Sequence, residues 1–157
     1  MTALPGLLLA LATASPHLDC SPPSAHAAPV TWVAVSNAAT SITGDTVFAP
    51  PRMTFANGKS VKVFFDGCGW IPTKTSAPHG TASIYTLWRV SSAHMPLLFN
   101  GNKLCAEGPT FMAVTSSPES GASSPASIFV NFYSSKTAPS AWDDVALCAS
   151  YTYELRR

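Results

Sequence analysis

Hydrophobic and polar residues alternate in short segments along most of this chain. Val61, Val63 and Phe65 share one face of such a segment, with polar residues between them. Asn57–Gly58 precedes it and favours a tight type I′ turn, so the pattern predicts a β-hairpin over 52–65. Further strands are predicted over 29–36, the end of 41–49, 81–90, 110–116, 127–134 and 147–155.

These seven or eight short strands, without an internal repeat, predict an all-β fold. The regular spacing favours a small antiparallel β-barrel, with a β-sandwich as the alternative. The polar segments 66–80 and 116–126 are predicted to be loops. A short helical turn is predicted in the C-terminal half over 138–146, with Ser140 as its N-cap and Asp143 in its first turn. Large apolar groups occupy both faces of the strand 81–90, so it is buried on both sides or lines a groove.

The first 27 residues have features of an export signal. The apolar stretch from Leu4 to Ala14 is shorter than the roughly 20 residues that cross a bilayer. Ala25–Ala27 forms an A-x-A cleavage motif, although no Lys or Arg precedes the apolar stretch. The prediction is a signal peptide over 1–27, which removes Cys20, and one β-barrel domain over 28–157. The mature protein would be periplasmic or secreted, without a transmembrane span.

Composition narrows the classes of function. Only 11% of residues are charged and the formal net charge is +1, so no strong field attracts nucleic acid. The hydrophobic share of 46% argues against a disordered chain. The motifs of nucleophile elbows, zinc proteases and phosphate-binding loops are missing from the sequence. No catalytic residue, cofactor or metal is therefore predicted, and the protein is expected not to be an enzyme.

Three cysteines remain in the predicted mature chain. Cys105 and Cys148 lie next to segments with strong strand patterns, whereas glycines flank Cys68 on both sides. An exported chain meets an oxidising compartment, so we predict a Cys105–Cys148 disulfide, with Cys68 either free or paired between two chains. A metal site of Cys68, His79 and His94 would need spacings that match no compact zinc pattern.

Three segments together resemble a known set of sequences: "SITGDTVFAPPRMTFANGKSV", "LWRVSS" with "NGNKLCAEGPTFMAV", and "CASYTYEL". They are similar to a group of small exported, mostly uncharacterised bacterial proteins with I-T-G-D, N-G-N-x-L-C and C-x-x-Y-x-Y motifs. The resemblance covers most of 41–155 and implies a β-barrel with a Cys105–Cys148 bridge, but no activity. A looser likeness to lipocalin-type or META-like envelope barrels rests on architecture alone.

Aromatic residues offer the best candidate for a binding site. The candidate ligand contacts are Trp70, Ile71, Tyr85, Trp88, Tyr133, Tyr151 and Tyr153. These side chains either fill the core or line an apolar cup for a small ligand or a partner's loop. The leading hypothesis is thus an exported, non-enzymatic barrel that binds a small apolar ligand or a protein partner. The alternatives are a hydrolase that uses Cys68 or His79, and a purely structural envelope protein.

Overall fold

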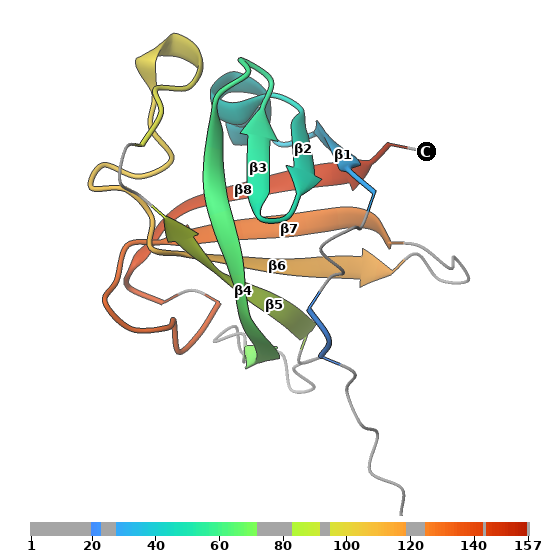
Figure 1. The fold of residues 1–157 in the computed structure, drawn as a ribbon, viewed down its shortest axis with the longest axis vertical. Helices are drawn as coiled ribbons and strands as arrows, with labels where there is room; N and C mark the ends of the chain where they lie inside the picture. Colours follow the sequence, from blue (N-terminus) through green and yellow to red (C-terminus); the bar gives the residue numbers. More distant parts are fainter. Residues whose placement is uncertain are drawn as a thin grey trace, which may run out of the picture.

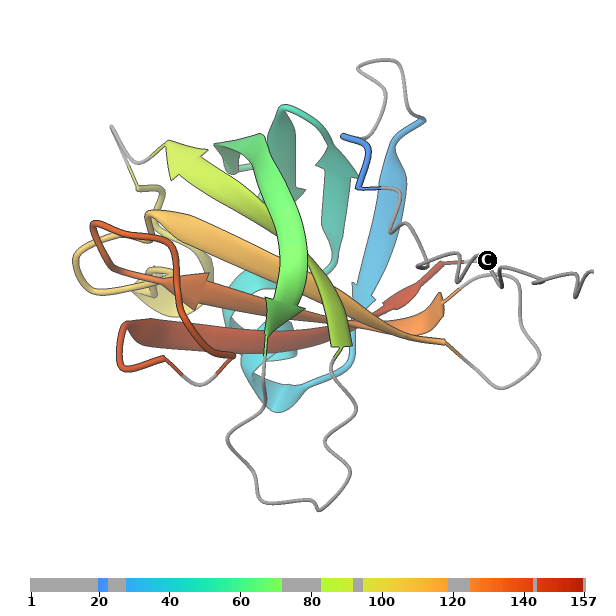
Figure 2. The same cartoon turned by 90° about the horizontal axis from the view of Figure 1, so that it is seen from below.

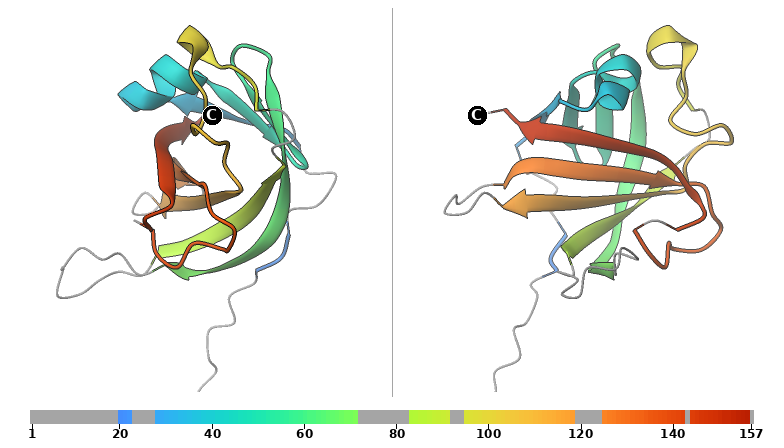
Figure 3. Two further views of the ribbon diagram at one scale, coloured as in Figure 1. Left: turned by 90° about the vertical axis from the view of Figure 1, so that its left-hand side faces the viewer. Right: turned by 180° about the vertical axis from the view of Figure 1, so that it is seen from behind.

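Eight antiparallel strands follow one another around a closed barrel in this computed structural model (Figures 1 and 3). The structure describes residues 20–22, 28–71, 83–91, 95–118, 125–142 and 144–156. The strands are β1 (Val30–Ala34), β2 (Thr46–Ala49), β3 (Arg52–Phe55), β4 (Ser60–Ile71), β5 (Ser83–Ser91), β6 (Phe111–Pro118), β7 (Pro125–Tyr133) and β8 (Leu147–Leu155). Pairing of β1 with β8 closes the barrel, and Trp32 lies opposite Leu155. The predicted all-β barrel is confirmed, and the sandwich alternative is wrong.

Two short helical turns accompany the strands. The turn η1 (Ala39–Thr43) joins β1 to β2, and η2 (Phe99–Gly101) lies between β5 and β6. Gly44 ends η1 with a positive φ of 61°. A Cβ atom there would lie 2.6 Å from the Cβ of Ala56. Both the positive φ and this close approach therefore require a glycine at position 44.

Large side chains from alternate strand positions fill the barrel interior. The residues with 0–1% exposure include Met53, Val63, Met112, Val130, Phe132, Tyr151 and Tyr153. Trp88 contacts two rings edge-on, with centroids 5.0 Å from Phe48 and 5.4 Å from Phe65. The inside of the barrel is therefore a packed hydrophobic core.

The predicted hairpin over 52–65 is confirmed, but its predicted turn type is wrong. A type I′ turn needs a positive φ at both Asn57 and Gly58, and only Gly58 has one, at 78°. Gly58 N donates to the Phe55 carbonyl at 2.9 Å, and Phe55 N donates to the Lys59 carbonyl at 2.8 Å. The connection is thus a three-residue loop, 56–58, that ends in a left-handed glycine.

Strand β4 extends into the segment that was predicted to be a loop. It is long and strongly curved (Figure 2), and it ends at Ile71 rather than at Phe65. The pairing with β5 shifts between Phe65 and Gly67, and Gly67 has a φ of 137° that only glycine adopts readily. The "DGCGW" sequence is therefore a β-bulge inside a strand. Residues 72–80 of the predicted loop lie outside the described residues.

A second apolar cluster lies on the outer side of the barrel wall. It consists of Leu87, Phe111, Ala113, Tyr133 and Ala141. Ala141 comes from the connection between β7 and β8, which covers this part of the wall. The middle of β5 is therefore buried on both faces, with Trp88 inside and Leu87 outside, as one of the two sequence interpretations expected, whereas Arg89 further along the outer face is exposed.

The predicted helical turn over 138–146 is wrong for the residues that the structure describes there. Residues 138–142 and 144–146 form bends and turns. The Asp144 carboxylate accepts from the backbone N of Ser140 at 3.0 Å and from its hydroxyl at 2.9 Å. It also accepts from the backbone N of Ala146 at 3.0 Å, so one carboxylate closes this turn without a helix. Asp143 lies outside the described residues.

Candidate functional site

Three of the predicted ligand contacts lie inside the barrel and are almost fully buried by their neighbours. Trp88, Tyr151 and Tyr153 are 3%, 1% and 0% exposed and belong to the interior cluster. The Tyr153 hydroxyl is 2.8 Å from the hydroxyl of Thr43, which is itself fully buried. These three residues are therefore part of the hydrophobic core, which is the first of the two roles considered for the aromatic residues.

The other four predicted ligand contacts are not among the interior side chains described above. Tyr133 is fully buried in the outer cluster, and Tyr85 packs against that cluster. Trp70 and Ile71 lie on β4, but their side chains are outside the described residues. The described members of the set are thus divided between the two faces of the barrel wall and do not form one cup.

Burial of the two interior tyrosines gives a prediction for high pH. Burial raises the pKa of Tyr151 from 10.0 to about 12, and it raises the pKa of Tyr153 as well, against the opposing hydrogen bond from Thr43. An unfolded tyrosine loses its proton near pH 10, while folded Tyr151 keeps it up to about pH 12. The contribution to stability is therefore complete below pH 10 and is lost as the pH rises toward 12.

Denaturant titrations across this pH range should show that decline, and Tyr151→Phe should decline less steeply than the parent chain. The phenylalanine cannot ionise at this position and keeps the buried ring, so the variant isolates the effect of the hydroxyl group. Identical pH profiles for the two proteins would contradict the assignment to Tyr151.

A shallow pocket of about 340 Å³ opens on the outer side of the wall. Its lining residues are Arg89, Val90, Thr110, Phe111, Ser135 and Lys136. The Arg89 guanidinium lies 5.9 Å from the centroid of the Phe111 ring, and its Nε donates to Asp66 Oδ1 at 2.9 Å. The backbone N of Ser135 donates to the Thr110 hydroxyl oxygen at 3.0 Å and holds these two lining residues together. Two cationic side chains and one aromatic ring thus share one open site.

Further exposed cations lie outside the pocket, on β3 and β4, the strands that follow β5 around the barrel. Arg52 of β3 lies directly opposite Lys62 of β4, and both side chains are exposed. The next outward residue of β4, Phe64, is 48% exposed and lies opposite Arg89 of β5. We name Arg52, Lys62, Arg89 and Lys136 the basic face. Sequence patterning missed this surface, because these residues are 84 positions apart at the extremes and only the barrel brings them to one side.

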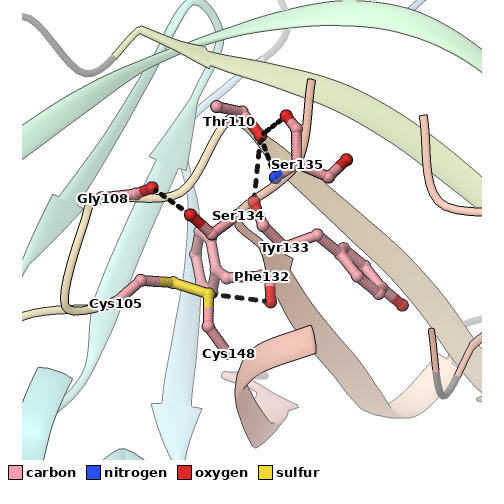
Figure 4. Close-up of a disulfide and its surroundings, with 8 residues drawn as sticks. All are labelled: Cys105, Gly108, Thr110, Phe132, Tyr133, Ser134, Ser135 and Cys148. Atoms are coloured by element: carbon pink, nitrogen blue, oxygen red, sulfur yellow. Dashed lines mark hydrogen bonds between the residues drawn. A yellow bond between two sulfur atoms is a disulfide. The ribbon is translucent and has the colours of Figure 1, made fainter. Parts of the chain in front are cut away.

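The predicted Cys105–Cys148 disulfide is confirmed (Figure 4). The Cα atoms lie 5.5 Å apart, and Cys105 is 4% exposed. Cys148 Sγ lies 3.3 Å from the Phe132 carbonyl oxygen, while the Ser134 hydroxyl donates to the Gly108 carbonyl at 3.2 Å. The bridge therefore joins the segment that leads into β6 to the start of β8, beside the end of β7.

The prediction that Cys68 is a free thiol or pairs between two chains is wrong, because Cys68 forms a disulfide with Cys20. A disulfide sulfur has no thiolate to act as a nucleophile or metal ligand. The described part of the chain contains no group of three His, Cys, Asp or Glu residues placed to hold a metal ion. His79 and His94 lie outside it. Within the same described ranges, no helix is long and apolar enough to cross a membrane.

Comparisons with protein-family models, with curated proteins and with solved structures find no match for this chain. A functional assignment therefore rests on the residues of the chain itself. Among the described residues, the basic face with its pocket offers the most specific surface chemistry.

Proposed function

We propose that this chain is an exported, non-enzymatic β-barrel that binds an acidic segment of a protein partner through its basic face. The observation that carries the proposal is the placement of Arg52 opposite Lys62 on adjacent strands. Like charges directly opposite one another destabilise a sheet, by about 0.2–1 kcal/mol. The described residues provide neither side chain with an ion-pair partner. An anionic partner would remove the repulsion that the folded chain leaves uncompensated.

The surroundings of this pair support a protein partner. Phe64 is exposed beside Lys62, and Phe111 lies under the Arg89 guanidinium. Aromatic and arginine side chains are enriched at the centres of protein interfaces. The formal net charge of the whole chain is only +1, so the cationic character is local and does not favour nucleic acid in general.

A small apolar ligand inside the barrel has less support. Tyr151, Tyr153 and Phe132 occupy the interior together with methionine and valine side chains at 0–1% exposure. A ligand there would have to displace packed side chains, and each lost core contact reduces stability. The outer pocket is open and partly cationic, which suits a carboxylate better than a hydrocarbon.

Export is supported by the two disulfides, because such bonds persist in oxidising compartments. A periplasmic or secreted location is therefore part of the proposal. The alternative of a hydrolase with Cys68 as its nucleophile has less support, because the Cys68 sulfur is bonded to Cys20. A purely structural role remains the rival class, and a binding measurement separates it from the proposal.

A single charge reversal tests the basic face. Lys62→Glu should lower retention on immobilised polyglutamate, measured as the salt concentration needed for elution, because it removes one cation and places an anion beside Arg52. The same change should raise the free energy of unfolding by up to about 1 kcal/mol, since opposite charges now face each other across the strands. Binding and stability should thus change in opposite directions.

Lys103→Glu is the matched control, with the same change in net charge at an exposed residue between η2 and β6. It should elute close to the parent chain. Equal losses of retention in both variants would show a bulk charge effect and contradict the assigned surface. Tighter retention of the parent chain on single-stranded DNA than on polyglutamate would contradict the choice of an acidic protein.

A further inference from the structure

The N-terminal arm supplies one half of a disulfide. Cys20 pairs with Cys68 of β4, and their Cα atoms lie 5.9 Å apart, within the roughly 4.4–6.8 Å that disulfides span. The second disulfide uses the remaining two of the four cysteines, and none is free. The complete set of pairs therefore requires a chain that still contains residue 20.

The side chain of Cys68 lies on the inward side of strand β4. It lies opposite Thr86 of β5, whose hydroxyl oxygen accepts from Trp88 Nε1 at 3.0 Å. Thr86 and Trp88 are two residues apart on one strand, so they share the inward side of the wall, and their partner Cys68 shares it too. Cys20 itself is exposed. The disulfide thus connects the inner side of the wall to a segment outside the strands.

The arm also joins strands that are not neighbours. Cys20 is bonded to β4, while the chain enters the barrel at β1 from Val30 onward. Two strands, β2 and β3, separate β1 from β4 in the barrel order. A covalent link between non-adjacent strands restricts the unfolded chain, with a sequence separation of 48 residues between the two cysteines.

Cleavage of the leader after Ala27 would prevent the Cys20–Cys68 disulfide. It would release Cys20 with the leader and leave Cys68 unpaired in an oxidising compartment, where an odd cysteine is open to intermolecular pairing. A second A-x-A motif, Ala12–Ala14, lies directly at the end of the apolar stretch, where peptidase sites normally follow the apolar region. The Ala25–Ala27 motif lies 13 residues further along.

We propose that the leader is removed after Ala14, so that the mature chain begins at Ser15 and keeps Cys20 for the disulfide with Cys68. Water hydrolyses the Ala14–Ser15 peptide bond and leaves a carboxylate on Ala14 and an amine on Ser15. The two cysteine thiols then give up two protons and two electrons to the disulfide of an oxidised dithiol protein in the export compartment. This inference rests on the export part of the proposed function.

The test is N-terminal sequencing of the full chain after export by a bacterial host, with free thiols alkylated and peptides mapped without reduction. A Ser15 N-terminus and a crosslinked Cys20–Cys68 peptide pair are expected. An Ala28 N-terminus with alkylated Cys68 would overturn the processing site but leave export intact. An unprocessed chain with alkylated cysteines would overturn export itself, so the two failures are distinguishable.

Two matched variants sharpen the assignment, since a bulky residue at the last position of the leader blocks the small-residue pocket of the peptidase. Ala14→Leu should abolish the Ser15 N-terminus, while Ala27→Leu should leave it at the parental yield. The reverse pattern would assign the cut to Ala27. Cys20→Ser should keep the Ser15 N-terminus and make Cys68 available to alkylation, which separates processing from disulfide formation.

Discussion

Replacement of Cys105 and Cys148 together by alanine is expected to lower the free energy of unfolding by about 4 kcal/mol. The bridge closes a loop with a sequence separation of 43 residues, and its loss gives the unfolded chain the corresponding freedom. For a domain whose net stability is typically about 5–15 kcal/mol, this is a large fraction. Thermal unfolding monitored by circular dichroism should show a midpoint lower by roughly 8–16 °C, from about 2–4 °C per kcal/mol.

The other disulfide provides the comparison. Cys20→Ala with Cys68→Ala opens a loop of similar length, with a separation of 48 residues, but Cys20 is exposed and belongs to no strand, whereas Cys105 is buried in the interior cluster. The second pair of substitutions should therefore reduce stability by less. Equal reductions would mean that loop length alone determines the effect and that burial of Cys105 adds nothing.

Trp88→Ala should be the most damaging single substitution, with a loss of about 3–5 kcal/mol. The indole ring contacts Phe48 and Phe65 edge-on and is 3% exposed, so its removal leaves a large cavity in a filled barrel. The indole N–H also donates to Thr86, and that hydroxyl loses its donor. Urea titrations should give a lower midpoint with little change in slope, because the same surface is exposed on unfolding.

Phe64→Ala is the control for Trp88→Ala, because Phe64 lies on the adjacent strand but faces outward and is 48% exposed. Its loss should change the free energy of unfolding by roughly 0.5 kcal/mol or less. A comparable loss in the two variants would contradict a packed interior and would favour a lumen open to ligands.

The hairpin over 52–65 shows how much a local pattern can specify. A two-residue turn at Asn57–Gly58 would place Met53 opposite Lys62, and the apolar and polar faces of the two strands would no longer match. The observed three-residue loop places Met53 opposite Val61 and Arg52 opposite Lys62. The alternation of apolar residues was therefore a better guide to register than the turn dipeptide, and the register creates the cationic pair of the basic face.

The aromatic residues show the opposite case. Tyr151 and Tyr153 alternate on β8 and both point inward, whereas Tyr133 ends β7 on the outer side under the connection to β8. A period of two tells which residues share a face, but not which face meets the core. Because parts of β5, β6 and β7 are covered on both sides, the positions of apolar residues alone did not distinguish the residues that line the interior from those of the outer cluster.

The sequence by itself determined the class of fold and most strand positions, because alternation and turn residues act over a few positions. It also predicted the Cys105–Cys148 pair, from the strand patterns beside both cysteines and the oxidising compartment of an exported chain. Only the tertiary structure decided that β4 passes through a bulge beyond Phe65, that Cys20 meets Cys68, and that the interior is filled. The basic face also arises only in the barrel. These features depend on contacts between residues distant in the chain, and closure of the barrel brings them together.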